Sequence, residues 1–437
     1  METCLVNLCV QGFGGGGRLR CVWTIVILVF WGAPFIVHSG EHTYSQQLTR
    51  AEQLLIESKS LVARGDFSGA RNGAEGAVAL REHALGHEHV EVAVALVVLA
   101  RVCLEMGAYD LSLSHNLRAL EIRKKHLGRD HRLVAETLIS LAELREKRGE
   151  FQKALLLYEQ ALDITLREQT GKPMLRAESL NNQAMLDLKM GAYDRALPRF
   201  QQALAIAEEV LGPGHEITAY PVHGLGSLYL AKGEHEKAVA AYSRALAIRE
   251  KALGSDHPDL LYTLNGLANV YLSKEQYERA AALYERAREL TGRVLGPNHT
   301  RMAAPLYNLA LVHTARGEYA PALQRHREAL AIRTATLNPE HPYLASSYSS
   351  LAHVHAARKE YAQALRLHQR ALVIQERALS ENHPEVADSL NNLALSHWAL
   401  GNHERAQQYF ARAVARREAH FRLTMNACRR QRRSDVF

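Results

Sequence analysis

Residues 389–414 read SLNNLALSHWALGNHERAQQYFARAV, and apolar side chains recur in this stretch every three or four positions. That spacing is typical of amphipathic helices. Closely similar segments, SLNNQAMLDLKMGAYDRALPRFQQAL and TLNGLANVYLSKEQYERAAALYERAR, begin at Ser179 and Thr263. The starts of the three segments are separated by multiples of 42 residues, and a fixed period of this length is the signature of a repeat array.

Small side chains recur at three positions of the 42-residue period. One of these positions holds Ala100, Ala142, Ala184, Gly226, Ala268, Ala310, Ala352 and Ala394. A second runs from Ala154 to Ala406 and a third from Ala119 to Ala413 in the same steps, with Ser112 as a departure from the second. Because small residues let two helices approach closely, each repeat is predicted to contain two packed helices.

A helix-stop signal lies between the first two of these positions. In most repeats it is a glycine followed two residues later by an aromatic residue or a histidine, as in Gly107 and Tyr109. Glycine commonly ends a helix, and the residue that follows opens the next one. Glu275 and Lys359 stand where the pattern expects glycine. Each repeat is therefore predicted to be a pair of antiparallel helices.

The repeats account for most of the chain. Its 437 residues exceed the roughly 250–300 at which a single hydrophobic core stops growing. A degenerate first copy extends the array, which then runs from about Tyr44 to His420. The predicted fold is all-α, a right-handed superhelical solenoid of about nine antiparallel helix pairs, in which stacked neighbours bury one continuous core.

The pattern of small and aromatic positions resembles the tetratricopeptide repeat, and the 42-residue period with LGxxHP loops is similar to the kinesin light chain subtype. Such arrays also resemble the repeat part of bacterial proteins that end in a caspase-like peptidase domain, and the resemblance concerns the repeats without that domain. The resemblance implies that the first helix of each pair lines a concave groove, and that the protein binds other proteins without catalysis.

The two ends of the chain differ from the repeats at residues 41–420. In residues 1–40, Arg18 and Arg20 precede an apolar run at positions 21–37, an order typical of a signal peptide. The run is also long enough to remain as a membrane anchor. We therefore expect an exported protein, periplasmic or extracellular, or one that contacts the membrane through residues 21–37 if they are not cleaved. The arginine-rich tail at 421–437 is expected to be disordered.

Several kinds of chemistry are disfavoured by the sequence. The net charge is +7, but the arginine-rich tail contributes much of it, so no nucleic-acid partner is expected. Histidines recur once per repeat in the loops from His89 to His383, too far apart to share a zinc ion; loop capping and packing are the expected roles. No glycine-rich phosphate loop follows a strand. The protein is predicted not to be an enzyme, with no cofactor and no metal site.

The resemblance implies that the first asparagine of the quoted stretch, Asn391, faces the groove. An asparagine amide both donates and accepts hydrogen bonds, so it can bind the backbone of an extended segment. The predicted peptide-binding residues share the groove face of the first helices and are Asn181, His223, Asn265, Asn269, Tyr307, Ser349 and Asn391. The second asparagine of each pair, such as Asn308, is predicted to join adjacent helices or to meet solvent.

The sequence thus predicts a non-catalytic scaffold that binds a protein or peptide ligand, as an extended segment or a helix, in its groove. Two alternatives stay open: the sensing half of a split peptidase or signalling system, and a truncated remnant of such a system. Pro221 and Pro305 occupy the same position of two repeats. They predict either a weak or bent point in the array or first helices that begin later.

Overall fold

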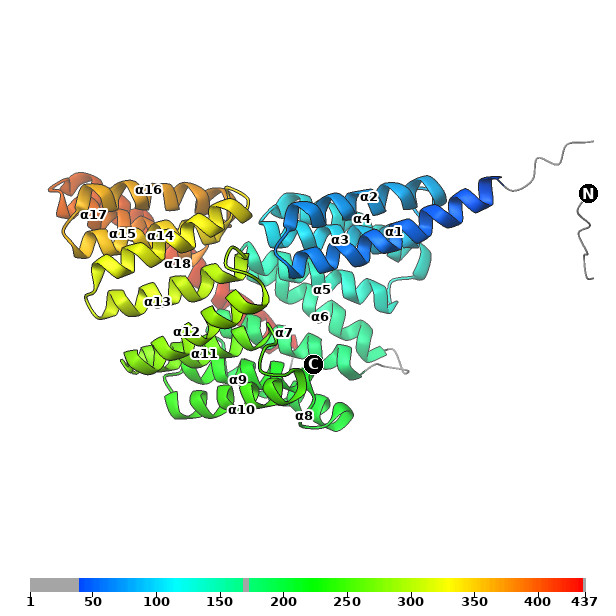
Figure 1. Ribbon diagram of the computed structural model, residues 1–437, viewed down its shortest axis with the longest axis horizontal. Coiled ribbons are helices and arrows are strands. Elements are labelled where there is room, and N and C mark those ends of the chain that lie inside the picture. The colour runs from blue at the N-terminus through cyan, green and yellow to red at the C-terminus, as the bar shows by residue number, and fades with distance from the viewer. Residues whose placement is uncertain (1–38, 168–172, 435–437) are drawn as a thin grey trace, which may run out of the picture. The chain divides into compact units, whose positions relative to one another are not determined.

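The structure is a computed structural model, and it describes residues 39–167 and 173–434. These residues form α-helices and two short 3-10 helices, with no β-strand among them (Figure 1). The first helices of the pairs are α1 (Ser39–Ala63), α3 (Val90–Met106), α5 (Arg132–Lys147), α7 (Pro173–Lys189), α9 (Ala219–Ala231), α11 (Leu260–Ser273), α13 (Ala303–Ala315), α15 (Pro342–Ala357) and α17 (Pro384–Ala399). The second helices are α2 (Phe67–Leu85), α4 (Tyr109–Leu127), α6 (Phe151–Arg167), α8 (Tyr193–Leu211), α10 (His235–Leu253), α12 (Tyr277–Val294), α14 (Tyr319–Thr336), α16 (Tyr361–Ala378) and α18 (His403–Ser434). The 3-10 helices η1 (Glu216–Thr218) and η2 (Thr300–Met302) precede α9 and α13.

Successive helices pack against one another along the array. From α2 onward, each helix contacts the next one in the chain, and residues 44–437 form one compact unit. The alanines at the three small positions of the 42-residue period are at most 3% exposed. Ser112, which stands where the second of these positions expects alanine, is also buried, and its hydroxyl donates a 2.8 Å hydrogen bond to the Ala100 carbonyl. The predicted all-α solenoid of about nine helix pairs is confirmed.

Most helix stops fall where the sequence predicts them. Gly107 has φ +80°, its N–H donates to the Leu104 carbonyl at 3.1 Å, and the next N–H donates to the Cys103 carbonyl at 2.8 Å. These two bonds form a Schellman motif, which satisfies carbonyls at the helix end. Glu275 and Lys359 form the same turn with φ of 57° and 64°. The repeat therefore imposes the turn even where the residue is not glycine.

Histidines begin most of the first helices. In each inter-repeat loop from His89 to His383 except that before α7, the histidine Nδ1 accepts the backbone N–H two residues later, at 3.0–3.2 Å. An accepting side chain at this place satisfies one of the free N–H groups of a helix start. The predicted capping role of the loop histidines is confirmed.

The two prolines shorten their helices. Pro221 and Pro305 lie at the third residue of α9 and α13, which are 13 residues long and follow a 3-10 turn. Proline is tolerated near a helix start because the N–H it lacks has no helical partner there. Of the two alternatives that the sequence leaves open, the later helix start is the one observed.

The C-terminal segment differs from its prediction. Helix α18 continues to Ser434, so residues 421–434 are helical where the sequence predicts a disordered tail. The segment is rich in arginine and has no glycine or proline to stop the helix. The apolar run at 21–37 lies outside the described residues. Within the described part of the chain, no helix is long and apolar enough to cross a bilayer.

Candidate functional site

A cleft of about 660 Å³ opens along the first helices α3, α5, α7 and α9. Its lining combines polar and apolar side chains of these helices, and the second helix α8 and the 3-10 helix η1 also contribute to it. The lining residues are Arg101, Arg132, Glu136, Glu143, Met174, Leu175, Ala177, Glu178, Asn181, Asn182, Ala203, Ala207, Glu216, Ile217, Tyr220 and Pro221. The cleft therefore lies on the face that the repeat pattern predicts to bind a partner.

Asn181 is the predicted binding residue that lines this cleft. Its side chain is half-buried, and its Nδ2 donates a 3.4 Å hydrogen bond to Asn182 Oδ1. The Asn181 Oδ1 atom is buried and has no hydrogen-bond partner in the protein. A buried acceptor without a partner costs free energy, so a donor that reaches this atom from a bound molecule would be favoured.

Three other predicted residues already have partners on neighbouring helices. Asn265 Oδ1, on α11, accepts a 3.3 Å hydrogen bond from Asn308 Nδ2 on α13, which confirms the joining role predicted for Asn308. The Tyr307 hydroxyl on α13 lies 2.8 Å from the Ser350 hydroxyl on α15, the first helix of the next repeat. Asn269 Oδ1 accepts a hydrogen bond from the Tyr284 hydroxyl. These side chains therefore join neighbouring helices.

The remaining predicted residues lie on α9, α15 and α17. His223 is half-buried against the Tyr242 ring, with ring centroids 5.0 Å apart, and its Nδ1 has no partner in the protein. Burial, with a smaller contribution from Arg249, lowers the pKa of His223 to about 4, so its imidazole is neutral at pH 7. Ser349 and Asn391 are half-buried. The seven residues thus follow a row of first helices, and the cleft holds one of them.

The cleft also contains groups that the sequence prediction missed. Glu136, Glu178 and Tyr220 stand three residues before Ile139, Asn181 and His223, on the same face of their helices one turn earlier. The signal was present in the 42-residue register, because residues i and i+3 of a helix are neighbours. The asparagine marks one turn of α7, whereas the lining residues of this helix extend from Met174 to Asn182.

The electrostatic balance of the cleft is acidic. Arg101 Nη1 on α3 lies 2.6 Å from Glu143 Oε2 on α5, and Arg132 Nε lies 3.9 Å from Glu136 Oε1. Glu178 and Glu216 complete a lining of four carboxylates and two guanidinium groups. Burial and then the Glu136 carboxylate raise the pKa of Glu178. The cleft therefore favours a ligand that brings hydrogen-bond donors or positive charge.

No metal centre competes with this assignment. Among residues 44–167 and 173–423, no group of three or more His, Cys, Asp or Glu side chains could hold a metal ion. Three histidines at equivalent positions of α13, α15 and α17 also have protein partners. His313 Nδ1 and His355 Nδ1 contact Glu318 and Glu360 at 2.6 and 2.5 Å, and His397 stacks on Tyr409.

Solved structures similar to this one come from several kinds of protein. The Rap protein complexed with competence and sporulation factor is 13% identical, with a TM-score of 0.58 over 85% of this chain and 99% of that chain. A putative kinesin light chain from Podosopora anserina is 27% identical over 48% of this chain and 98% of its own, with a TM-score of 0.40. BtubC (BKLC) from P. vanneervenii is 22% identical over 56% and 91%, with a TM-score of 0.40.

The sequence itself carries a family signature over most of its length. No curated protein matches it. The tetratricopeptide repeat model matches residues 58–125, 99–167, 175–251, 219–291, 259–335 and 343–419. These segments coincide with the helix pairs and cover well over half of the chain, so the chain belongs to the tetratricopeptide repeat family.

Proposed function

We propose that the protein is a non-catalytic interaction scaffold that binds an extended segment of a partner protein along its first helices. The repeat family and its fold support a scaffold for protein interactions. An array of this kind presents a long continuous surface, which suits a partner segment better than a small substrate.

The observation that carries the proposal is the buried, unpartnered Oδ1 of Asn181 inside the cleft. A backbone N–H of an extended segment supplies the donor that this atom lacks. The surplus of carboxylates over guanidinium groups favours a segment that carries basic side chains. Tyr220, which is 49% exposed, adds an apolar surface at the end of the cleft.

A protein of the same fold offers a parallel. The Rap protein, whose structure matches 85% of this chain, is complexed with competence and sporulation factor. At 13% identity the likeness concerns the fold alone, so the parallel supports a binding role for the array and leaves the partner to be identified by chemistry.

Site-specific photo-crosslinking tests the proposal. A photoreactive phenylalanine analogue is placed at Met174 or Tyr220, which line the cleft, or at Leu156, which is 58% exposed on the second helix α6. The full chain is crosslinked in its native extract, and the attached peptides are mapped by mass spectrometry. We expect positions 174 and 220 to capture one contiguous segment of a single partner.

Two variants control for this experiment. Asn181→Ala is expected to lower the crosslinking yield at position 220 several-fold, because the partner loses its acceptor, whereas Leu156→Ala leaves the yield unchanged. Helix content by circular dichroism must be equal in both. Capture of the partner from position 156 but not from 174 or 220 would place binding outside the cleft and refute the proposal.

A further inference from the structure

Turns of the array that are far apart in sequence touch one another. The His299 Nε2 atom lies 3.1 Å from the Ala63 carbonyl oxygen, beside Gly65. His341 lies against Gly107, and His383 lies against Gly149. In each pair the histidine follows its glycine by 234 residues, between five and six repeats of 42. The same contact therefore occurs three times, in register with the repeat.

Backbone hydrogen bonds accompany two of these contacts. The Asn338 N–H donates to the Met106 carbonyl at 3.3 Å, and the Ser380 N–H donates to the Arg148 carbonyl at 2.8 Å. Each bond joins the loop that carries the histidine to the turn that carries the glycine. The contacts are thus specific pairings of two loops rather than a loose approach of two surfaces.

Side chains add to the same interface. Ala378 packs against a buried cluster of Leu104, Tyr109 and Leu144 from the other turn of the array. The Phe151 ring lies 6.2 Å from the His383 ring and 6.0 Å from the His420 ring, measured between centroids. Helices α6 and α18 are in contact there.

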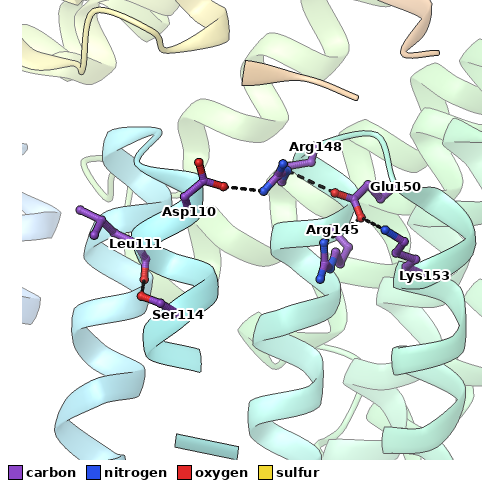
Figure 2. Close-up of polar contacts among 7 residues, drawn as sticks. All are labelled: Asp110, Leu111, Ser114, Arg145, Arg148, Glu150 and Lys153. Carbon is purple, nitrogen blue, oxygen red and sulfur yellow. Dashed lines mark hydrogen bonds and ion pairs between the residues drawn. The ribbon is translucent and has the colours of Figure 1, made fainter. Parts of the chain in front are cut away.

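The turn that receives Ser380 is held by ion pairs (Figure 2). Arg148, whose carbonyl accepts the hydrogen bond, contacts Asp110 at 2.8 Å and Glu150 at 3.2 Å. Glu150 also contacts Arg145 at 2.8 Å and Lys153 at 2.7 Å. These contacts tie α4, α5 and α6 together, so the receiving turn is also held by contacts within its own part of the array.

Glycine is required at these turns by the contact more than by the backbone. Glu275 and Lys359 show that the turn conformation accepts other residues. At position 107, however, a Cβ would lie 2.7 Å from His341 Cδ2, and at position 149 a Cβ would overlap the His383 ring. The rings cannot swing away freely, because their Nδ1 atoms cap α15 and α17.

We propose that the three histidine–glycine contacts act as a clasp that holds the array in a closed turn, and that opening of the clasp admits a partner segment to the cleft. The cleft is lined by helices α3, α5, α7 and α9, which lie between Gly65 and His299 in the chain. Burial lowers the pKa of Arg101, which lines the cleft, but Glu143, Glu105 and Tyr262 of α11 raise it by more. Admission of a partner rests on the function proposed above, whereas the clasp itself does not.

Hydrogen exchange on the full chain tests the clasp. The variant Gly107→Ala/Gly149→Ala introduces both clashes. Its matched control, Gly191→Ala/Gly233→Ala, changes glycines of the same turn, with φ of 73°, at which an added Cβ meets nothing within 4 Å. We expect the first variant alone to lose protection of the Asn338 and Ser380 amides and to show a larger radius of gyration in solution scattering. Equal protection and equal size in the two variants would refute the clasp.

A milder pair of substitutions guards against general misfolding. His383→Asn retains an acceptor for the Glu385 N–H but removes the ring that reaches Gly149, and His257→Asn makes the same exchange in a loop that precedes Asp259. We expect faster exchange of the Ser380 amide in the first variant and not in the second. Unchanged exchange at Ser380 in both would count against the clasp.

Chemical labelling tests whether the clasp controls access. The variant Asn181→Cys is made in a chain whose native cysteines are replaced by serine or alanine: Cys4, Cys9, Cys21, Cys103 and Cys428. It is labelled in parallel with N-ethylmaleimide, a small reagent, and with a bulky polyethylene-glycol maleimide. Opening the clasp with Gly107→Ala/Gly149→Ala is expected to speed the bulky reagent several-fold and to leave the small one unchanged. If the Asn338 and Ser380 amides lose their protection from hydrogen exchange but the bulky reagent reacts no faster, control of access to the cleft by the clasp is refuted. No partner is needed, so failure of the proposed function leaves this result intact.

Discussion

At the residue scale, the turn after each first helix shows how strongly the repeat constrains single positions. Glu275 and Lys359 adopt positive φ, the left-handed conformation that glycine occupies at this place in other repeats. For an L-residue with a Cβ this conformation costs roughly 1–2 kcal/mol. The two residues keep it because the flanking helices determine the path of the chain.

Glycine at these two positions is expected to stabilise the protein. Glu275→Gly and Lys359→Gly should each raise the free energy of unfolding by about 1 kcal/mol, because glycine adopts positive φ without strain. Urea denaturation followed by circular dichroism measures the change. Glu275→Ala is the control, since alanine retains the strain; a gain from alanine equal to that from glycine would show that the side chain, not φ, is responsible.

At the scale of the element, buried arginines join the repeats. Arg123 is 3% exposed and donates to the Leu133 carbonyl at 2.7 Å and to the Thr137 hydroxyl at 2.8 Å. Arg333 donates to the Ser347 hydroxyl at 2.6 Å, and Arg249 to the Thr263 hydroxyl, each 14 residues further along the chain. A second helix thereby fixes the start of the next first helix through side-chain hydrogen bonds.

Loss of one such junction is expected to be costly, and loss of both partners less so. Arg123→Leu should lower the free energy of unfolding by roughly 1–3 kcal/mol, because buried acceptors on α5 lose their donor. The double variant Arg123→Leu/Thr137→Val should recover part of this loss, since it removes one of those acceptors as well. Chemical denaturation of four proteins, the parent, Arg123→Leu, Thr137→Val and the double variant, measures the effect; additive losses in the double variant would argue against coupling.

At the scale of the whole molecule, buried neutral histidines make the array sensitive to acid. His326 and His368 are 1% and 2% exposed, and burial lowers the pKa of His326 to about 4 and that of His368 to about 3. Burial likewise lowers the pKa of His341 and His383 to about 4. The unfolded chain, with pKa values near 6.5, binds more protons in this window. Stability is therefore present above about pH 6.5 and is lost as the pH falls towards 4.

Replacing two of these histidines is expected to weaken the pH dependence. Phe200 and Tyr284 occupy the positions equivalent to His326 and His368 and are fully buried, so His326→Phe/His368→Phe should be accommodated. Between pH 6.5 and 4 each substitution removes up to one proton, or about 1.4 kcal/mol per pH unit, from the slope of stability against pH. Urea denaturation at several pH values measures the slope, and the single variants should each give about half of the change. A slope identical to that of the parent chain would contradict the assignment of neutral buried imidazoles.

The candidate site was predictable in outline rather than in detail. The repeat register singled out Asn181 on α7, and that residue lines the cleft. The same register gave no sign that Asn265 is hydrogen bonded to Asn308, or that Glu178 and Tyr220 complete the lining. These features depend on the distance between neighbouring first helices, which the pattern of one helix does not contain.

The sequence by itself determined the period, the helix pairs, their glycine stops and their histidine caps, because each depends on hydrogen bonds and side-chain spacings within a few residues. Only the tertiary structure decided that His299, His341 and His383 meet Gly65, Gly107 and Gly149. Each repeat is rotated by a small angle relative to its neighbour, and that angle is set by packing between helices. Summed over more than five repeats, it determines which distant turns meet, and no local pattern of residues encodes that sum.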